Sequence, residues 1–172
     1  AGGGGGKGYG PSLPGSPTAV SGNNSTFSTI TSAGGGYGGQ PNSSPAPVTY
    51  VQGADGGSGG GTGGGNSGAG GVGNTPPVSP AQGSNGGAGS TSSQTLGGSG
   101  GGATGTGSTA PGCSPPPSTP SRGAGATTHI SASPVVYSTG GAYSHYNPSA
   151  FNPIDPASDN TGDGADAQNA AP

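Results

Sequence analysis

The stretch between residues 53 and 107 constrains the fold most, because its glycine runs are interrupted mainly by serine, threonine, asparagine and alanine. A helix interior loses about 1 kcal/mol for each glycine relative to alanine, and a strand of glycines has no side chains to pack. Two solutions remain for this stretch. It is either a disordered linker or an assembly of extended, polyproline-II-like segments that pack through their backbones.

The composition of the whole chain bears on this choice. The 172 residues include 45 glycines and 19 prolines, 24% are hydrophobic and only 4% are charged. A low hydrophobic content by itself favours disorder. The charge is so low, however, that self-repulsion does not hold the chain open. Composition alone still favours disorder, and we prefer an ordered glycine-rich body because two segments outside this tract resemble a known family.

In an ordered body of this kind, glycine is the interior residue. Polyproline II has three residues per turn and no internal hydrogen bonds, so its amides and carbonyls must bond to neighbouring segments. Collagen is excluded because glycine does not recur at every third position between Gly56 and Gly73. We predict a mostly irregular, all-β fold without significant helix. Its centre is a polyglycine-II-like bundle with turns at 74–77 and Pro80 and with serine, threonine and asparagine facing outward.

The composition also predicts three parts along the chain. They are a glycine-rich opening with short strands (1–52), a polyglycine-II-like body that includes a proline-rich loop at 111–120 (53–122), and a part with short strands, an aromatic cluster and an acidic tail (123–172). The proline-rich loop is interpreted as a stiff spacer.

Two places outside the glycine tract have the β-branched and aromatic residues typical of short strands. Residues 25–31 fit one strand, in which Phe27 and Ile30 lie on opposite faces. Residues 127–137 fit a short strand, a break at Pro134 and a second short strand.

The charge pattern excludes some partners. The net charge is −3 and Lys7 and Arg122 are the only strong bases, too few for a phosphate-binding surface, so we expect no nucleic acid partner. The sequence has no apolar run long enough for a membrane span and no signal-peptide pattern. A single cysteine, Cys113, excludes an intramolecular disulfide. Because the chain begins with Ala1 and contains no methionine, we expect a fragment or a processed product.

Short enzyme motifs occur here only as chance matches. Residues 56–60 fit the nucleophile-elbow pattern without any serine, aspartate and histidine context to support it. Lys7 lacks the serine or threonine that follows the lysine of a P-loop. Most carboxylates lie in the C-terminal tail, so paired acid-base chemistry has little to use. We expect no catalytic activity and no cofactor.

No metal site is expected either. Residues 159–166 partly resemble a calcium loop, but Ala170 stands where a bidentate glutamate is needed, so we prefer a solvated acidic tail. His129 and His145 are too few and too far apart in the sequence for zinc.

The most informative side chains form a cluster near the C-terminus: Tyr137, Tyr143, His145, Tyr146 and Phe151. Aromatic rings on a polar scaffold are suited to stacking on the sugars of a cell-wall or capsule glycan. The alternative is a small core that anchors this region, because buried aromatic rings carry most of the apolar area that so few side chains provide. We favour the core and keep these five residues as candidate glycan contacts.

Two segments resemble a known family. Residues 22–36, GNNSTFSTITSAGGG, are similar to the glycine-rich domain of bacteriophage tail fibre and minor tail proteins, in which such a motif and a short strand lead into a glycine run. Residues 130–141 and 160–164 resemble the later part of that domain. The similarity covers the two ends of the chain, and the middle matches in composition alone. The closing hydrophobic strand with Arg-Tyr, usual in the family, does not occur in this sequence.

The resemblance implies a structural, non-catalytic virion component, extracellular and at or near the tail tip, that contributes to host-surface recognition. The partners then expected are other tail proteins, further copies of the chain in a homo-oligomer such as a trimer, and a glycan or protein of the host surface. In some phage adhesins, similar tracts form polyglycine-II layers whose loops carry the specificity. The alternative is a secreted glycine-rich matrix or fibre protein, or an ice-binding polyglycine-II protein, although regular Gly-x-x repeats and flat threonine or alanine rows are not seen.

Overall fold

The computed structural model describes seven stretches of the chain: residues 19–40, 52–64, 68–90, 96–110, 122–130, 132–142 and 163–164. These stretches contain no helix, and their regular structure consists of two antiparallel hairpins. The first pairs β1 (Ser25–Phe27) with β2 (Ile30–Ser32), and the second pairs β3 (Ala126–Thr128) with β4 (Val135–Tyr137). Within the described stretches, the prediction of a mostly irregular fold with a few short strands and no significant helix is confirmed.

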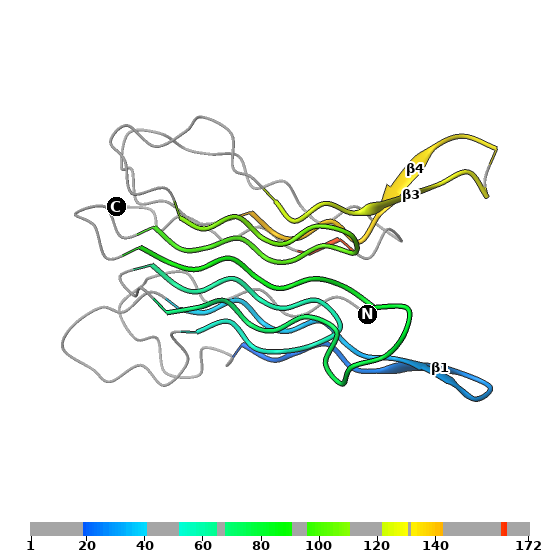
Figure 1. Cartoon of the computed structure of the whole chain (residues 1–172), viewed down its shortest axis with the longest axis horizontal. Coiled ribbons are helices and arrows are strands. Elements are labelled where there is room, and N and C mark those ends of the chain that lie inside the picture. The colour runs from blue at the N-terminus through cyan, green and yellow to red at the C-terminus, as the bar shows by residue number, and fades with distance from the viewer. Residues whose placement is uncertain are drawn as a thin grey trace.

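The rest of the described chain forms a body of extended segments that run side by side, and both hairpins project from the same end of this body (Figure 1). The principal segments are residues 33–40, 53–55, 57–64, 68–73, 82–90, 96–102, 105–110 and 138–142. Main-chain hydrogen bonds connect these segments across the whole body. The backbone therefore supplies the contacts that side chains supply in an ordinary core.

Segment 57–64 shows how regular these bonds are. The amide of Gly59 donates to the carbonyl oxygen of Ser84 at 3.0 Å, and the amide of Thr62 donates to that of Gly87 at 3.1 Å. The two donors are three residues apart and so are the two acceptors. Donor and acceptor residue numbers increase in the same direction, so the two segments run parallel. Three residues make one turn of polyproline II.

The same spacing recurs towards another neighbour, in the opposite direction. The carbonyl oxygens of Gly59 and Thr62 accept from the amides of Gly101 at 2.9 Å and Gly98 at 2.8 Å, so this pair of segments is antiparallel. On its other sides, segment 57–64 bonds to residues 34–39, 54 and 71–74. One extended segment is therefore bonded to five others around it, whereas a strand in a flat sheet bonds to two.

Close approach of the backbones requires glycine at the contacts. A methyl group on Gly101 would meet the carbonyl oxygen of Ser84, and one on Gly60 would meet that of Tyr37. Each of these oxygens belongs to an adjacent segment. Glycine is thus the residue that allows the segments to lie within hydrogen-bonding distance of one another.

Few side chains are buried within the described stretches. Leu96 is the largest fully enclosed one, and the hydroxyl-bearing Thr62 and Ser99 are enclosed as well. Thr62 Oγ1 donates to the carbonyl oxygen of Gly68 at 3.1 Å, and Ser99 Oγ accepts from the amide of Ser108 at 2.7 Å. The expectation that serine and threonine face outward is wrong for these two residues, because the interior backbone offers partners for their hydroxyl groups.

The first hairpin corrects another prediction. Residues 25–31 do not form one strand, because the chain reverses at Ser28 and Thr29 and then pairs with itself. Ser28 has a φ of 53°, in the left-handed region that hairpin turns use. As a result Phe27 and Ile30 are register partners on one face of the hairpin, not on opposite faces. Neither turn residue is the glycine or asparagine that signals such a turn in a sequence.

The second hairpin agrees with the prediction of two short strands separated by a break at Pro134. In its register Ala126 lies opposite Tyr137. Within the connection, the amide of Ala132 donates to the carbonyl oxygen of His129 at 2.9 Å.

Candidate binding surface at the hairpin end

Four large apolar side chains of the described hairpin residues are exposed, and the three that lie at or beside the turns are exposed more than Val136 of β4. Phe27 is 81% exposed, Ile30 66% and Ile130 95%. Phe27 and Ile30 flank the turn between β1 and β2, and Ile130 lies in the connection between β3 and β4. We call these three residues the hairpin tips. Because both hairpins extend from one end of the body, the hairpin tips belong to one end of the molecule (Figure 1).

The first hairpin stands away from the body, and every residue of β1 and β2 is exposed. Its base is held by two hydrogen bonds. Asn24 Oδ1 accepts from the amide of Gly34 at 3.0 Å, and the amide of Gly22 donates to the carbonyl oxygen of Gly35 at 2.8 Å. These bonds join the chain entering β1 to the chain leaving β2. An isolated two-stranded hairpin is marginally stable in water, so these contacts fix its direction.

The second hairpin is held at its base in a similar way. The amide of Ala103 donates to the carbonyl oxygen of Ser138, just after β4, at 2.9 Å. Thr104 Oγ1 donates to the carbonyl oxygen of Gly125, just before β3, at 2.9 Å. Residues 103–104 are therefore hydrogen-bonded to the chain on both sides of the hairpin, just before β3 and just after β4.

A loop at residues 74–82 is tied to the base of the first hairpin. Asn74 Oδ1 accepts from the amides of Val78 at 3.2 Å and Gln82 at 3.1 Å, which closes the loop on itself. The side-chain oxygen of Gln82 accepts from the amide of Ala33, the residue that follows β2. The loop and the hairpin are thereby fixed relative to each other.

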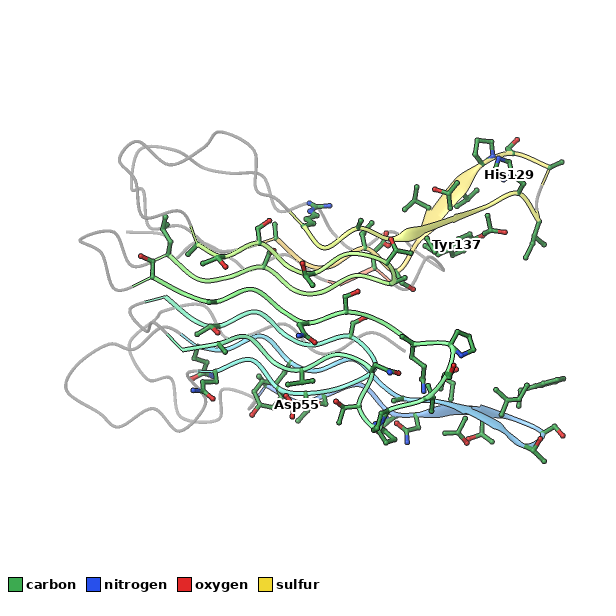
Figure 2. The ribbon with its side chains drawn as sticks, in the orientation of Figure 1. Asp55, His129 and Tyr137 are labelled. Atoms are coloured by element: carbon green, nitrogen blue, oxygen red, sulfur yellow. The ribbon has the colours of Figure 1, made fainter. Side chains whose placement is uncertain are left out.

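The charge of this end is very low. No charged side chain occurs between residues 19 and 40, and Arg122 and His129 are the only basic side chains between residues 122 and 142. His129 lies towards the outer part of its hairpin and Tyr137 nearer the body (Figure 2). A surface of this kind offers apolar contact and hydroxyl groups, not ion pairs.

One of the five candidate glycan contacts lies in the described part of the chain. Tyr137 is half-buried at the end of β4, opposite Ala126. The other four, Tyr143, His145, Tyr146 and Phe151, lie outside the described residues, as does Cys113. The aromatic cluster therefore remains a prediction.

Most of the segment that resembles a calcium loop also lies outside the described residues. Its Asp163 is described, and Asp163 Oδ1 accepts from the amide of Thr139 at 2.9 Å. The described residues contain no group of three or more histidine, cysteine, aspartate or glutamate side chains that could hold a metal ion. The described stretches contain no helix with the length and apolar character that a membrane crossing requires.

The sequence pattern assigns Phe27 and Ile30 to a short strand but does not mark the hairpin tips as a binding surface. The signal that could have found them is the occurrence of large apolar residues in short stretches of serine and threonine, where no other large side chains are available to cover them. Comparison of the chain with family models, curated proteins and solved structures found no significant match. Function is therefore inferred from the residues and their arrangement.

Proposed function

We propose that this chain is a polyglycine-II-like bundle that serves as a stiff, non-catalytic support for its two hairpins. The three-residue spacing of the bonds from Gly59 and Thr62 to two neighbouring segments supports this architecture. So does the presence of hydrogen-bonded neighbours on five sides of segment 57–64. A support whose segments are joined by backbone hydrogen bonds in several directions resists bending, because it has no single apolar interface along which two layers could slide.

We further propose that the support belongs to the tail fibre or tail tip of a bacteriophage and contributes to recognition of the host surface, either of its glycans or of its envelope. The resemblance of residues 22–36 and 130–141 to the tail glycine-rich domain supports this assignment. These two segments contain or adjoin both hairpins, so the similarity coincides with the parts that project from the body. Its partners would be other tail proteins, further copies of the chain and the host surface, with Tyr137 among the candidate glycan contacts.

The single observation that carries the proposal is the projection of both hairpins, with their exposed apolar residues, from one end of a backbone-bonded body. The first test is immunogold labelling of phage particles whose genome encodes this chain. We expect label at the tail tip, and particles without the polypeptide would contradict the assignment.

The second test is competition. The purified chain is added to host cells before the phage, and free phage is counted after adsorption. We expect the chain to slow adsorption, and a variant with Phe27, Ile30 and Ile130 all replaced by serine to do so less well. Adsorption at an unchanged rate in the presence of saturating chain would contradict a role in host recognition.

A further inference from the structure

We propose that the hairpin tips bind a lipid bilayer by inserting their apolar side chains into its interfacial region. This inference rests on the proposed function, because it names the component of a cell surface that the hairpins meet. The three side chains concerned are Phe27, Ile30 and Ile130, which are 81%, 66% and 95% exposed. Water covers them in the free protein, and apolar surface of this size gains free energy when it leaves water.

The charge of the hairpin end favours lipid over a charged partner. Residues 19–40 carry no charged side chain, and the second hairpin carries only His129 between its first and last strand residues. A surface with a single histidine and no other charged group offers an acidic or basic protein few ion pairs and attracts anionic headgroups weakly. It can still enter the apolar part of a membrane interface, where a charged side chain would be costly.

The polarity along the first hairpin also fits an interface. Phe27 and Ile30 flank the turn, and one step closer to the body Thr26 and Thr31 are register partners whose hydroxyl oxygens lie 3.4 Å apart. The turn residues Ser28 and Thr29 carry hydroxyl groups as well, so the two apolar side chains lie between hydroxyl-bearing residues, a mixture that suits the partly polar interfacial region of a bilayer. The free edges of a two-stranded hairpin keep unpaired backbone groups, so insertion must be shallow.

Two hairpins on one support strengthen such binding. The base of the first hairpin is bonded to residues 34–35, and that of the second to residues 103–104. Because both bases belong to one hydrogen-bonded body, insertion of one hairpin raises the effective concentration of the other at the same membrane. Individually weak contacts therefore add up to a measurable affinity.

The first experiment uses the fact that the chain contains no tryptophan. Phe27→Trp places a single fluorophore at a hairpin tip, and Val20→Trp places one at an exposed body position before β1, where the native valine is 64% exposed. Each variant is titrated with phosphatidylcholine vesicles. We expect a blue shift and quenching by lipids brominated on their acyl chains for Phe27→Trp and neither change for Val20→Trp.

The second experiment measures affinity by vesicle cosedimentation. Ile30→Ser is expected to lower the apparent partition coefficient about tenfold, since much of one apolar side chain is lost from the interface. The matched control is Val20→Ser, because Val20 and Ile30 are exposed to 64% and 66%, and we expect it to bind as the native chain does. Binding should also be unchanged by added salt, because no ion pairs contribute.

Three outcomes would overturn the lipid proposal: no cosedimentation with vesicles, equal spectral shifts in the two tryptophan variants, or equal losses from Ile30→Ser and Val20→Ser. Its failure is distinguishable from failure of the proposed function. If the chain ignores vesicles yet still slows phage adsorption through its hairpin tips, the host partner is a protein or glycan, and only the lipid proposal is wrong.

Discussion

The amide of Gly59 donates a hydrogen bond of 3.0 Å to the carbonyl oxygen of Ser84, and the pattern repeats three residues later along both segments. In a β-ladder, bonds to a given neighbour recur every second residue, because the strand period is two. When the period is three residues, successive amides point towards different neighbouring segments. This explains how a chain with few large side chains obtains contacts on many sides.

Our first prediction concerns the spacing between segments. Gly101→Ala should lower the free energy of unfolding by about 1–3 kcal/mol or more, because the added methyl group meets the carbonyl oxygen of Ser84 and the backbone must move. The measurement is chemical denaturation followed by circular dichroism.

The control for this variant is its neighbour. At Gly100 the nearest atom to an added methyl group is the amide nitrogen of Gly141 at 3.2 Å, so only a small adjustment is needed. Gly100→Ala should therefore destabilise the protein clearly less than Gly101→Ala. Equal effects of the two substitutions would show that close backbone approach does not determine stability at this segment.

The second prediction concerns a buried hydroxyl group. Ser99→Ala removes the oxygen that accepts from the amide of Ser108 at 2.7 Å, in a place where the Ser99 side chain is fully buried. The loss of this partner should cost about 1–3 kcal/mol of stability. Ser108→Ala is the control, since Ser108 enters this bond through its main-chain amide, and it should change the melting temperature much less. A Ser99→Ala variant as stable as the native chain would argue against this bond.

The third prediction concerns the turn of the first hairpin. Ser28 has a φ of 53°, a conformation that glycine adopts without the steric cost of a side chain. Ser28→Gly should therefore favour the hairpin by roughly 0.5–1 kcal/mol, read from the persistence of cross-strand nuclear Overhauser effects between Phe27 and Ile30 on heating. Thr29 does not share this conformation, so Thr29→Gly should weaken the same signals. The reverse order would mean that the turn has a different geometry.

The fourth prediction concerns a carboxylate that bonds to the backbone. Asp55 Oδ1 accepts from the amide of Val72 at 2.6 Å and so links two segments of the body. Asp55→Ala should cost about 0.5–1.5 kcal/mol, whereas Asp55→Asn keeps an acceptor oxygen and should cost less. Thermal unfolding of the two variants makes the comparison. Equal losses would show that the charge, and not the acceptor, is what matters.

The absence of helix and the scarcity of strands in the described residues followed from physical rules. Glycine in the number seen between residues 53 and 107 is unfavourable in either element. The strands around Pro134 were also predictable, because β-branched and aromatic residues gather there and nowhere else nearby. Local composition was sufficient in both cases.

Other features depend on tertiary context and were not predictable. Ser28 is an uncommon residue for a hairpin turn, so the sequence predicts one continuous strand where the chain in fact reverses between β1 and β2. Nothing near Thr62 or Ser99 in the sequence distinguishes them from the exposed hydroxyl residues around them, since burial arises from segments distant in the chain. The exposure of Phe27, Ile30 and Ile130 likewise follows from where the hairpins leave the body.

Amide hydrogen exchange, resolved by residue with nuclear magnetic resonance, tests the central claim most directly. If main-chain bonds between segments hold the molecule together, the amides of Gly59, Thr62, Gly98 and Gly101 exchange many times more slowly than those of an unstructured peptide. The exposed hairpin turn at Ser28 and Thr29 exchanges much faster than these four. Exchange of the four amides at the rate of an unstructured chain would contradict the account.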